Sequence, residues 1–361
     1  MIGIAMLSLN QPAWAACERE LKALEAAQGE AVVGAFTKLS TCDGGKAGEA
    51  FPAAVKRSGD VVALTNLAVA AIGVGQDAAV HGMLELVPDY AAREETARAI
   101  GGKCVEDAKV EAFVVGLHDA LKDRAFVGWA GALRACPSEA LTAKLEDLAA
   151  APPDRAFDDK YATVVELYAR KRGAAALPVL KDAGIGATGG GPFVIVVDAM
   201  SKAVTPEGIG GEPAPADRDA LVAALGELAG ATTNADELRR LANAMVAVDA
   251  AQAAGALLPK LYPDRVQSDG SFLYGVVATE TCEDASVVHW AVVEDHGKRW
   301  SVSEALDGPV QGFKHKLKCG AAWAVQVTPE PVASEDEIGN WAEGLVGEGG
   351  KLKAEKTIVL K

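Results

Sequence analysis

The chain has 361 residues, of which 50% are apolar and 5% aromatic, so it carries enough apolar surface for a sizeable core and is not wholly disordered. Its 35 basic and 50 acidic side chains give a formal net charge of −15. This charge repels phosphate backbones and anionic headgroups, and we therefore expect neither nucleic acid nor an anionic membrane as a general partner.

Residues 1–16 have the order of a secretory signal. An apolar run over residues 2–9 is followed by Pro12 and by the small-residue motif Ala13-Trp14-Ala15, which is typical of a cleavage site. The run is too short to span a bilayer, and no Lys or Arg precedes it. We expect a periplasmic or secreted protein of a bacterial cell envelope. Two alternatives stay open, a lipid anchor on Cys17 and an apolar N-terminal arm of a cytosolic protein.

The six cysteines form no C-x-x-C motif, so a zinc ribbon and a thioredoxin-like redox site both lack their basic spacing. The expected helices and strands favour one of the 15 connectivities. It pairs Cys17 with Cys42, Cys104 with Cys136, and Cys282 with Cys319. Such bridges fit an oxidising compartment, in agreement with the export signal. The alternative is six reduced thiols buried as small hydrophobic side chains.

Between Cys17 and Tyr262, apolar residues recur at helical spacing, each group forming one buried face of an amphipathic helix. Residues 17–58 are expected to form an N-terminal capping hairpin region. The clearest later stripes are Val110, Val114 and Leu117; Phe126, Trp129, Ala130 and Leu133; Tyr161, Val164, Val165 and Tyr168; and Leu238, Leu241, Met245 and Val248. Asn234 and Glu237 have the spacing of a capping box at the start of the last of these helices.

The expected helices come in pairs that recur. Equivalent apolar positions in the second helix of each pair are Val80, Val110, Leu141, Leu177, Leu221 and Leu257. Periods of this length indicate stacked helical hairpins, because one hairpin cannot bury its apolar face without neighbours. The longest interval contains a Gly/Pro loop, Gly208 to Pro215, which accounts for its excess length.

The segments RAFVGWAGALRACPSEALTAKLEDL, DDKYATVVELYARKRGAAALPVLKDA and DELRRLANAMVAVDAAQAAGALLPKL share an Ala-rich first helix, a short turn and a second helix reading A-L-x-x-L. In this they resemble HEAT-like (armadillo-type) α-solenoid repeats, over roughly Asp60 to Tyr262. The resemblance implies a mainly α fold, a right-handed αα-superhelix spanning residues 17–262, and an extended concave surface that suits protein ligands.

After Tyr262 the pattern changes to that of strands. The runs 272–279, 286–293 and 321–327 are rich in Val, Trp, Tyr and Thr, and a further strand is expected over 352–360. Ser334 to Glu337 form a capping box that opens a helix carrying Ile338, Trp341 and Leu345. We therefore expect a small α+β domain over residues 263–361, braced by Cys282 and Cys319.

The sequence Gly184-Ile185-Gly186-Ala187-Thr188-Gly189 matches G-x-G-x-x-G. A dinucleotide site needs a strand before this motif and an acidic residue about 20 residues after it. Here a helix is expected before it, and the next acidic residue is Asp198. We interpret the motif as a loop between repeats and expect no cofactor.

None of the five histidines lies in an H-E-x-x-H motif, and no two are spaced i, i+4, so we expect no metal site. They are His81, His118, His289, His296 and His315. No serine lies in G-x-S-x-G or S-x-x-K, and no catalytic set can be assembled by spacing. The acidic runs Glu94-Glu95 and 335–337 fit helix faces and helix starts.

We therefore expect a non-enzymatic protein-binding or scaffolding protein outside the cytoplasm, with no transmembrane segment and a partner that is basic, given the net charge. The insertions Gly184 to Gly191 and Thr205 to Pro215 are expected to shape its surface. An alternative is a small-ligand receptor or divergent enzyme in the C-terminal domain, with His289, Glu294, Asp295 and His296 as candidates. A third possibility is an envelope subunit that assembles with itself.

Overall fold

The structure, a computed structural model, is mainly helical. It describes residues 13–154, 158–205, 214–241, 244–245, 263–265, 272–281, 286–295, 323–327, 332–344, 351–353 and 357–360. The chain divides into two compact units, one comprising Met1–Ala149 with Asp158–Lys171 and the other Ala150–Phe157 with Arg172–Lys361. The predicted domain boundary at residue 262 lies outside the described residues and stays a prediction.

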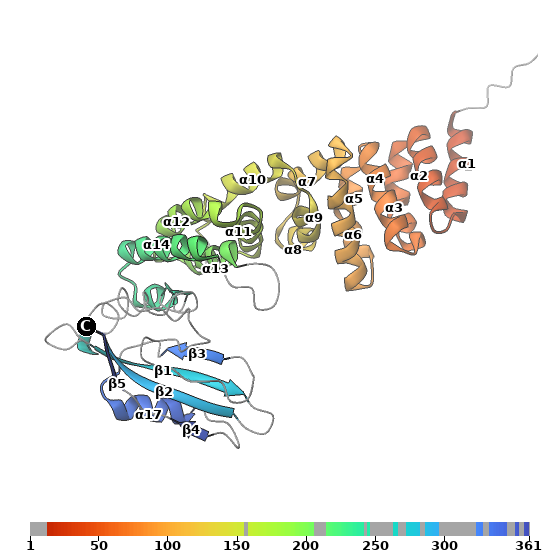
Figure 1. Cartoon of the computed structure of the whole chain (residues 1–361). Coiled ribbons are helices and arrows are strands. Elements are labelled where there is room, and N and C mark those ends of the chain that lie inside the picture. Colours follow the sequence, from red (N-terminus) through yellow and green to blue (C-terminus); the bar gives the residue numbers. More distant parts are fainter. Residues whose placement is uncertain are drawn as a thin grey trace, which may run out of the picture. The chain divides into compact units, whose positions relative to one another are not determined.

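The first unit consists of short helices joined by tight turns (Figure 1). They are α1 (Ala13–Ala26), α2 (Ala31–Cys42), α3 (Gly44–Ser58), α4 (Val61–Gly73), α5 (Asp77–His81), α6 (Tyr90–Gly102), α7 (Ala108–Ala120), α8 (Asp123–Gly128), α9 (Ala130–Ala135), α10 (Glu139–Ala149) and α11 (Asp159–Arg172), with the 3₁₀ helices η1 (Met83–Leu86) and η2 (Lys103–Val105).

Aspartates set the starts of many of these helices. Asp43, Asp60, Asp89 and Asp107 precede α3, α4, α6 and α7, and each side chain accepts a hydrogen bond from a backbone N–H of the following first turn. A side-chain oxygen at this position satisfies a donor that the helix leaves unpaired, and its charge is favourable at the positive end of the helix dipole. The residue just before each of these helices thus determines where the helix begins.

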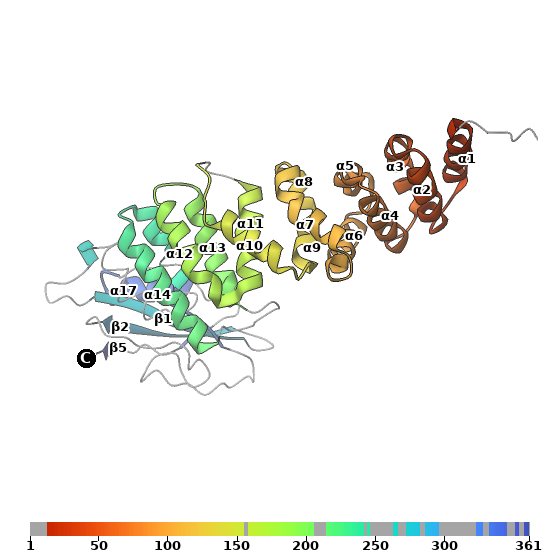
Figure 2. The ribbon, with the colours of Figure 1, turned by 90° about the horizontal axis from the view of Figure 1, so that it is seen from above.

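Helices that alternate along the chain contact one another in two layers. In the first layer α2, α4, α6 and α9 touch in succession, and in the second layer α1, α3, α5, α7 and α10 do so. Figures 1 and 2 show α1 to α9 following one another side by side. Each helix therefore buries its apolar stripe against elements that lie close to it in sequence.

The apolar positions predicted to be equivalent are buried. Val80, Val110, Leu141, Leu177 and Leu221 lie in α5, α7, α10, α12 (Leu177–Gly186) and α14 (Pro215–Ala231), each 3% exposed or less. Leu257 lies outside the described residues. Within the described part of the chain, the predicted stripes are also buried, apart from Ala130, which is half-buried.

The stripe around Trp129 was predicted to belong to one continuous helix, and this prediction is wrong. The helix is interrupted at Trp129, which separates α8 from α9. Trp129 is 1% exposed, and its ring meets the Phe113 ring edge to face at 5.4 Å. The indole N–H also donates to the carbonyl of His81, 3.3 Å away. The interruption places a large side chain in contact with α5 and α7.

The helical part of the second unit contains α12, α13 (Pro192–Val204) and α14, which contact one another, and the 3₁₀ helix η3 (Gly173–Ala176). Residues 235–241 are also helical. Lys181 on α12 pairs with Glu227 on α14 at 2.7 Å, and Arg240 pairs with Asp198 on α13. These ion pairs again join a helix to a later helix of the chain.

The C-terminal part of this unit holds a five-stranded sheet of order β3-β1-β2-β4, in which β5 also pairs with β2. Its strands are β1 (Phe272–Thr281), β2 (Ser286–Asp295), β3 (Trp323–Val327), β4 (Lys351–Lys353) and β5 (Thr357–Leu360). β1 is antiparallel to β2 and β3, whereas β4 and β5 run parallel to β2.

The described strands β1, β2 and β3 overlap the predicted runs 272–279, 286–293 and 321–327, and β1 and β2 each extend two residues further. The expected strand over 352–360 is two strands, β4 and β5, which pair with separate stretches of β2. Ser334 accepts from the backbone N–H of Glu337 at the start of α17 (Glu335–Gly344), as the capping box predicts. Ile338 and Ala342 of α17 pack with Val292 and Val332 in a small core cluster.

Candidate functional site

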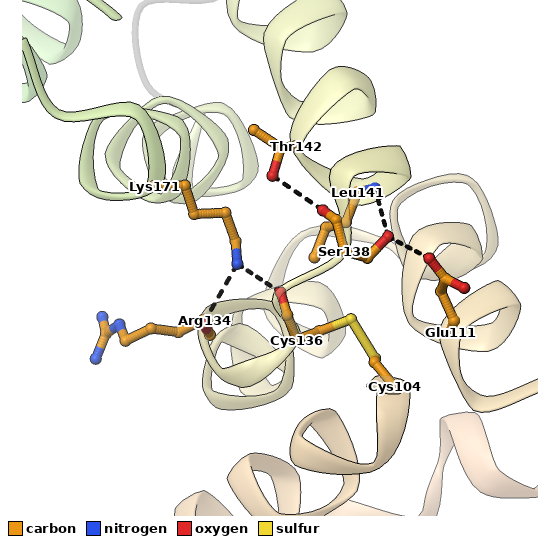
Figure 3. Close-up of a disulfide and its surroundings, with 8 residues drawn as sticks. All are labelled: Cys104, Glu111, Arg134, Cys136, Ser138, Leu141, Thr142 and Lys171. Atoms are coloured by element: carbon orange, nitrogen blue, oxygen red, sulfur yellow. Dashed lines mark hydrogen bonds between the residues drawn. A yellow bond between two sulfur atoms is a disulfide. The ribbon is translucent and has the colours of Figure 1, made fainter. Parts of the chain in front are cut away.

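A disulfide and several hydrogen bonds join α6, α7, α9, α10 and α11 at one junction of the first unit (Figure 3). Cys104 lies in η2, directly after α6, and Cys136 is the C-cap of α9, with 5.4 Å between their Cα atoms. Both side chains are buried. The bridge therefore ties together the ends of two successive first-layer helices.

The disulfide lies where the backbones of α6 and α9 approach closely. A Cβ atom placed on Gly101 would lie 2.7 Å from the Cα and 2.8 Å from the carbonyl carbon of Ala132. A Cβ on Gly131 would lie 3.2 Å from the carbonyl oxygen of Glu94. Glycine is needed at Gly101 because no side chain fits between the two backbones. The sequence shows these glycines without indicating which backbone they face.

Lys171, near the end of α11, binds the exposed carbonyl end of α9. Its Nζ donates to the carbonyl oxygens of Cys136 at 2.6 Å and Arg134 at 3.3 Å (Figure 3). A cation is favourable at this end of a helix, where the last carbonyls have no partner within the helix. Burial lowers the pKa of the Lys171 ammonium from its ordinary value. The side chain serves to fix α11 against α9.

Ser138 joins α7 to α10 at the same junction. Its Oγ donates to Glu111 Oε1 at 2.5 Å and accepts from the backbone N–H of Leu141 at 3.1 Å, which makes it the N-cap of α10 (Figure 3). The Thr142 hydroxyl donates to the Ser138 carbonyl at 3.0 Å. One serine therefore caps α10 and anchors it to α7.

Two further lysines bind helix ends in the same way as Lys171. Lys109 Nζ on α7 donates to the carbonyl of Gly73, the last residue of α4, at 2.5 Å. Lys160 Nζ on α11 donates to the carbonyls of His118 and Leu121 at the end of α7, at 2.6 Å and 2.8 Å. A lysine that binds the carbonyl end of an earlier helix thus joins α7 to α4 and α11 to α7. Sequence reasoning missed all three lysines, because nothing local marks a lysine that caps a distant helix.

Two of the three predicted cysteine pairs lie at disulfide distance. Cys17 and Cys42 are bridged with 5.5 Å between their Cα atoms and join α1 to the last residue of α2. Cys104 and Cys136 form the second pair. Cys282 and Cys319 lie outside the described residues, so their pairing stays a prediction. These bridges fit an oxidising, extracytoplasmic location.

The glycine motif over residues 184–189 is only in part the predicted loop, because its first half, Gly184 to Gly186, forms the end of helix α12. A helix and not a strand therefore leads into the motif, so it lacks the element that a dinucleotide site requires. Gly184 is buried in α12, where a Cβ would lie 2.9 Å from a Leu228 methyl group. Gly189 has a φ of +80°, and its N–H donates to Glu237 Oε1 at 2.5 Å. The glycines allow close packing and a turn.

Glu237 departs from the capping box predicted for it. Asn234 Oδ1 accepts from the N–H of Asp236 at 2.9 Å and of Glu237 at 3.4 Å, so Asn234 does cap this helix. The Glu237 carboxylate is 6% exposed and accepts from the Gly189 N–H and the Thr232 hydroxyl. It therefore holds the turn after α12 against the start of the helix at residues 235–241.

The histidines of the first unit lie against aromatic rings. The His81 ring stacks on Phe113 with centroids 5.1 Å apart, and the His118 ring meets Phe126 edge to face at 5.5 Å. Burial is the largest cause that lowers the pKa of both histidines. Within the described part of the chain, no group of three or more His, Cys, Asp and Glu residues is placed to hold a metal ion.

The candidates predicted in the C-terminal region are spread along β2. His289 pairs with Ala278 and Lys353, whereas Asp295 pairs with Phe272 and Leu360. At about 3.3 Å per residue, their backbones are about 20 Å apart along the strand. Glu294 also lies in β2, next to Asp295. His296 and His315 lie outside the described residues.

Among the described residues, no helix combines the length and apolar character that crossing a bilayer requires. No protein-family model matches the chain, and no curated protein matches it. A solved structure from the computational design of self-assembling cyclic protein homooligomers aligns with 71% of this chain and 85% of its own, at 14% identity and a TM-score of 0.14. A TM-score this low carries no argument about fold or function.

Proposed function

We propose that the chain is a non-enzymatic protein-binding or scaffolding protein outside the cytoplasm, built as a HEAT-like α-solenoid with a right-handed superhelical array of two-helix units. The observation that carries this proposal is the succession of contacts within two layers, in which each helix touches the next helix of its own layer. In a solenoid, every unit contacts only its neighbours and the outer helix faces stay available to a partner.

The charge of three helices in the second layer supports a basic partner. These helices, α5, α7 and α10, carry more carboxylates than cations, and both of their lysines are engaged, Lys109 with a helix end and Lys144 with Asp119. The carboxylates are Asp77, Glu111, Asp119, Glu139, Glu146 and Asp147. An acidic face of this kind attracts basic partners and raises their association rate.

The disulfides support an exported protein, periplasmic or secreted. The Cys17 sulfur is bonded to Cys42, and the same sulfur cannot also carry the thioether of a lipid anchor. Removal of residues 1–16 would take away the first turn of α1 and leave this bridge intact. We therefore favour a cleaved signal over lipid attachment at Cys17.

The test is chemical cross-linking and affinity capture in the native cell envelope, with the full chain as bait. We compare it with Asp77→Lys/Asp147→Lys, which reverses two exposed charges of the acidic helices α5 and α10. Glu95→Lys/Asp123→Lys reverses two charges on α6 and α8 and is the matched control. A protein that the chain and the control capture, and the first variant does not, supports the proposal. Equal capture by all three contradicts the acidic face as the binding surface.

The C-terminal sheet offers the contrasting outcome, a small-ligand receptor or enzyme. A thermal-shift screen of the full chain against divalent metals and metabolites tests it. A ligand that binds only the native state stabilises it. A reproducible rise in melting temperature on adding one compound, lost in His289→Gln, would therefore favour a small-ligand receptor or enzyme.

A further inference from the structure

One aromatic ring in the first unit is flanked by two basic groups from different helices. The His118 ring of α7 meets the Phe126 ring of α8 edge to face, with centroids 5.5 Å apart and planes at 83°. The Lys160 ammonium of α11 lies 5.5 Å from the centroid of the same ring. Phe126 is fully buried and His118 is half-buried. His118 and Lys160 therefore share one partly desolvated environment.

Lys160 is also the group that fastens α11 to the end of α7. Its ammonium donates to the carbonyl of His118 at 2.6 Å and to that of Leu121 at 2.8 Å. A cation here is stabilised by the helix dipole and by the ring face beside it. His118 thus supplies both a carbonyl that binds Lys160 and an imidazole side chain that can gain a positive charge near neutral pH.

The charges around His118 come from four elements. Asp119 Oδ1 on α7 lies 3.2 Å from His118 Nδ1, and Lys144 on α10 binds the other oxygen of that carboxylate at 3.1 Å. Lys160 on α11 is the third, while α8 carries Asp123 and Arg124, of opposite charge. Protonation of His118 therefore adds a cation beside two lysines and one carboxylate that Lys144 already neutralises in part.

We propose that His118 is a pH-sensitive latch: in its neutral form it leaves Lys160 fastened to the carbonyl end of α7, and in its protonated form it repels Lys160 and loosens the first turns of α11. The direction of the His118 pKa agrees with this geometry, since burial lowers it most, Lys160 and Lys144 lower it further, and only Asp119 raises it. An exported protein meets the pH of its surroundings, where such a latch would operate.

The test is amide hydrogen exchange of residues 160–165 in the full chain at pH 7.5 and pH 5.0, compared with His118→Gln. Both proteins have the same intrinsic exchange rates at these amides, so their ratio isolates opening. We expect exchange in the wild-type chain to accelerate relative to His118→Gln by about threefold or more on going to pH 5.0. The matched control is His81→Gln, which removes the other half-buried histidine of this unit and should keep the wild-type response.

A second variant separates the latch from a purely structural role of the ring. In Lys160→Met the repulsion is absent, so the pH response of residues 160–165 should vanish and the pKa of His118, followed by NMR titration, should rise. Folding of each variant is checked at pH 7.5 by circular dichroism. An unchanged exchange ratio at the two pH values, or an unchanged His118 pKa in Lys160→Met, overturns the proposal.

Discussion

Replacing Gly101 by Ala tests whether α6 and α9 are as close as the structure has them. The new methyl group would lie within 2.8 Å of the Cα and carbonyl carbon of Ala132, and these are backbone atoms that cannot rotate away. To restore ordinary contact distances, α9 must move by about half an ångström or more, and its end is tied to α6 through Cys104 and Cys136.

Two opposing terms set the magnitude. Alanine is favoured over glycine inside a helix by about 0.5–1 kcal/mol. Overpacking of a well-filled interior typically costs about 1–3 kcal/mol and sometimes more, and a backbone obstacle belongs at the upper end. We therefore expect Gly101→Ala to lower the free energy of unfolding by roughly 2 kcal/mol. For a unit of about 150–250 residues, each kcal/mol corresponds to about 2–4 °C in melting temperature.

The matched control is Gly102→Ala. Gly102 lies in the same helix, is exposed, has ordinary helical dihedrals, and a Cβ there meets no atom within 4 Å. This variant should be as stable as the wild type or more stable, by up to about 1 kcal/mol. Scanning calorimetry of both variants under oxidising conditions gives the comparison. A Gly101→Ala protein that melts at or above the temperature of Gly102→Ala would refute the close approach of α6 and α9.

Three further predictions concern the same unit. Replacing Cys104 and Cys136 together by Ala removes a bridge of sequence separation 32 and should cost about 3–4 kcal/mol of unfolding free energy in denaturant titrations, and none under reducing conditions. Ser138→Ala removes the N-cap of α10 and should cost about 1–2 kcal/mol; a cost near zero would show that the cap is not formed. The folded-state pKa of His81 is lowered by burial, so the unfolded chain binds the proton more readily and stability should fall as pH drops below about 6.5. His81→Phe should show a shallower decline between pH 7.5 and pH 5.0, and identical slopes would contradict the assignment.

Of the candidate site, the sequence predicted the cysteine pair, and the reason is local. Cys104 and Cys136 were paired because each was expected at a helix end in successive units, and the structure bridges them there. Ser138, Gly101 and Gly131 were not predicted. Their role depends on partners far along the chain, such as Glu111 for Ser138 and Ala132 for Gly101. A local pattern contains no information about such partners.

The sequence by itself determined where helices begin, which faces they bury and which region changes to strands, because caps and periodicity are properties of a few neighbouring residues. Only the tertiary structure decided that a helix stops at Trp129, that Glu237 binds a turn and does not close its capping box, and that Lys160 and Lys171 fasten helix ends. In each case the deciding partner lies far along the chain, because a buried ring needs packing partners and the last carbonyls of a helix need donors from outside that helix.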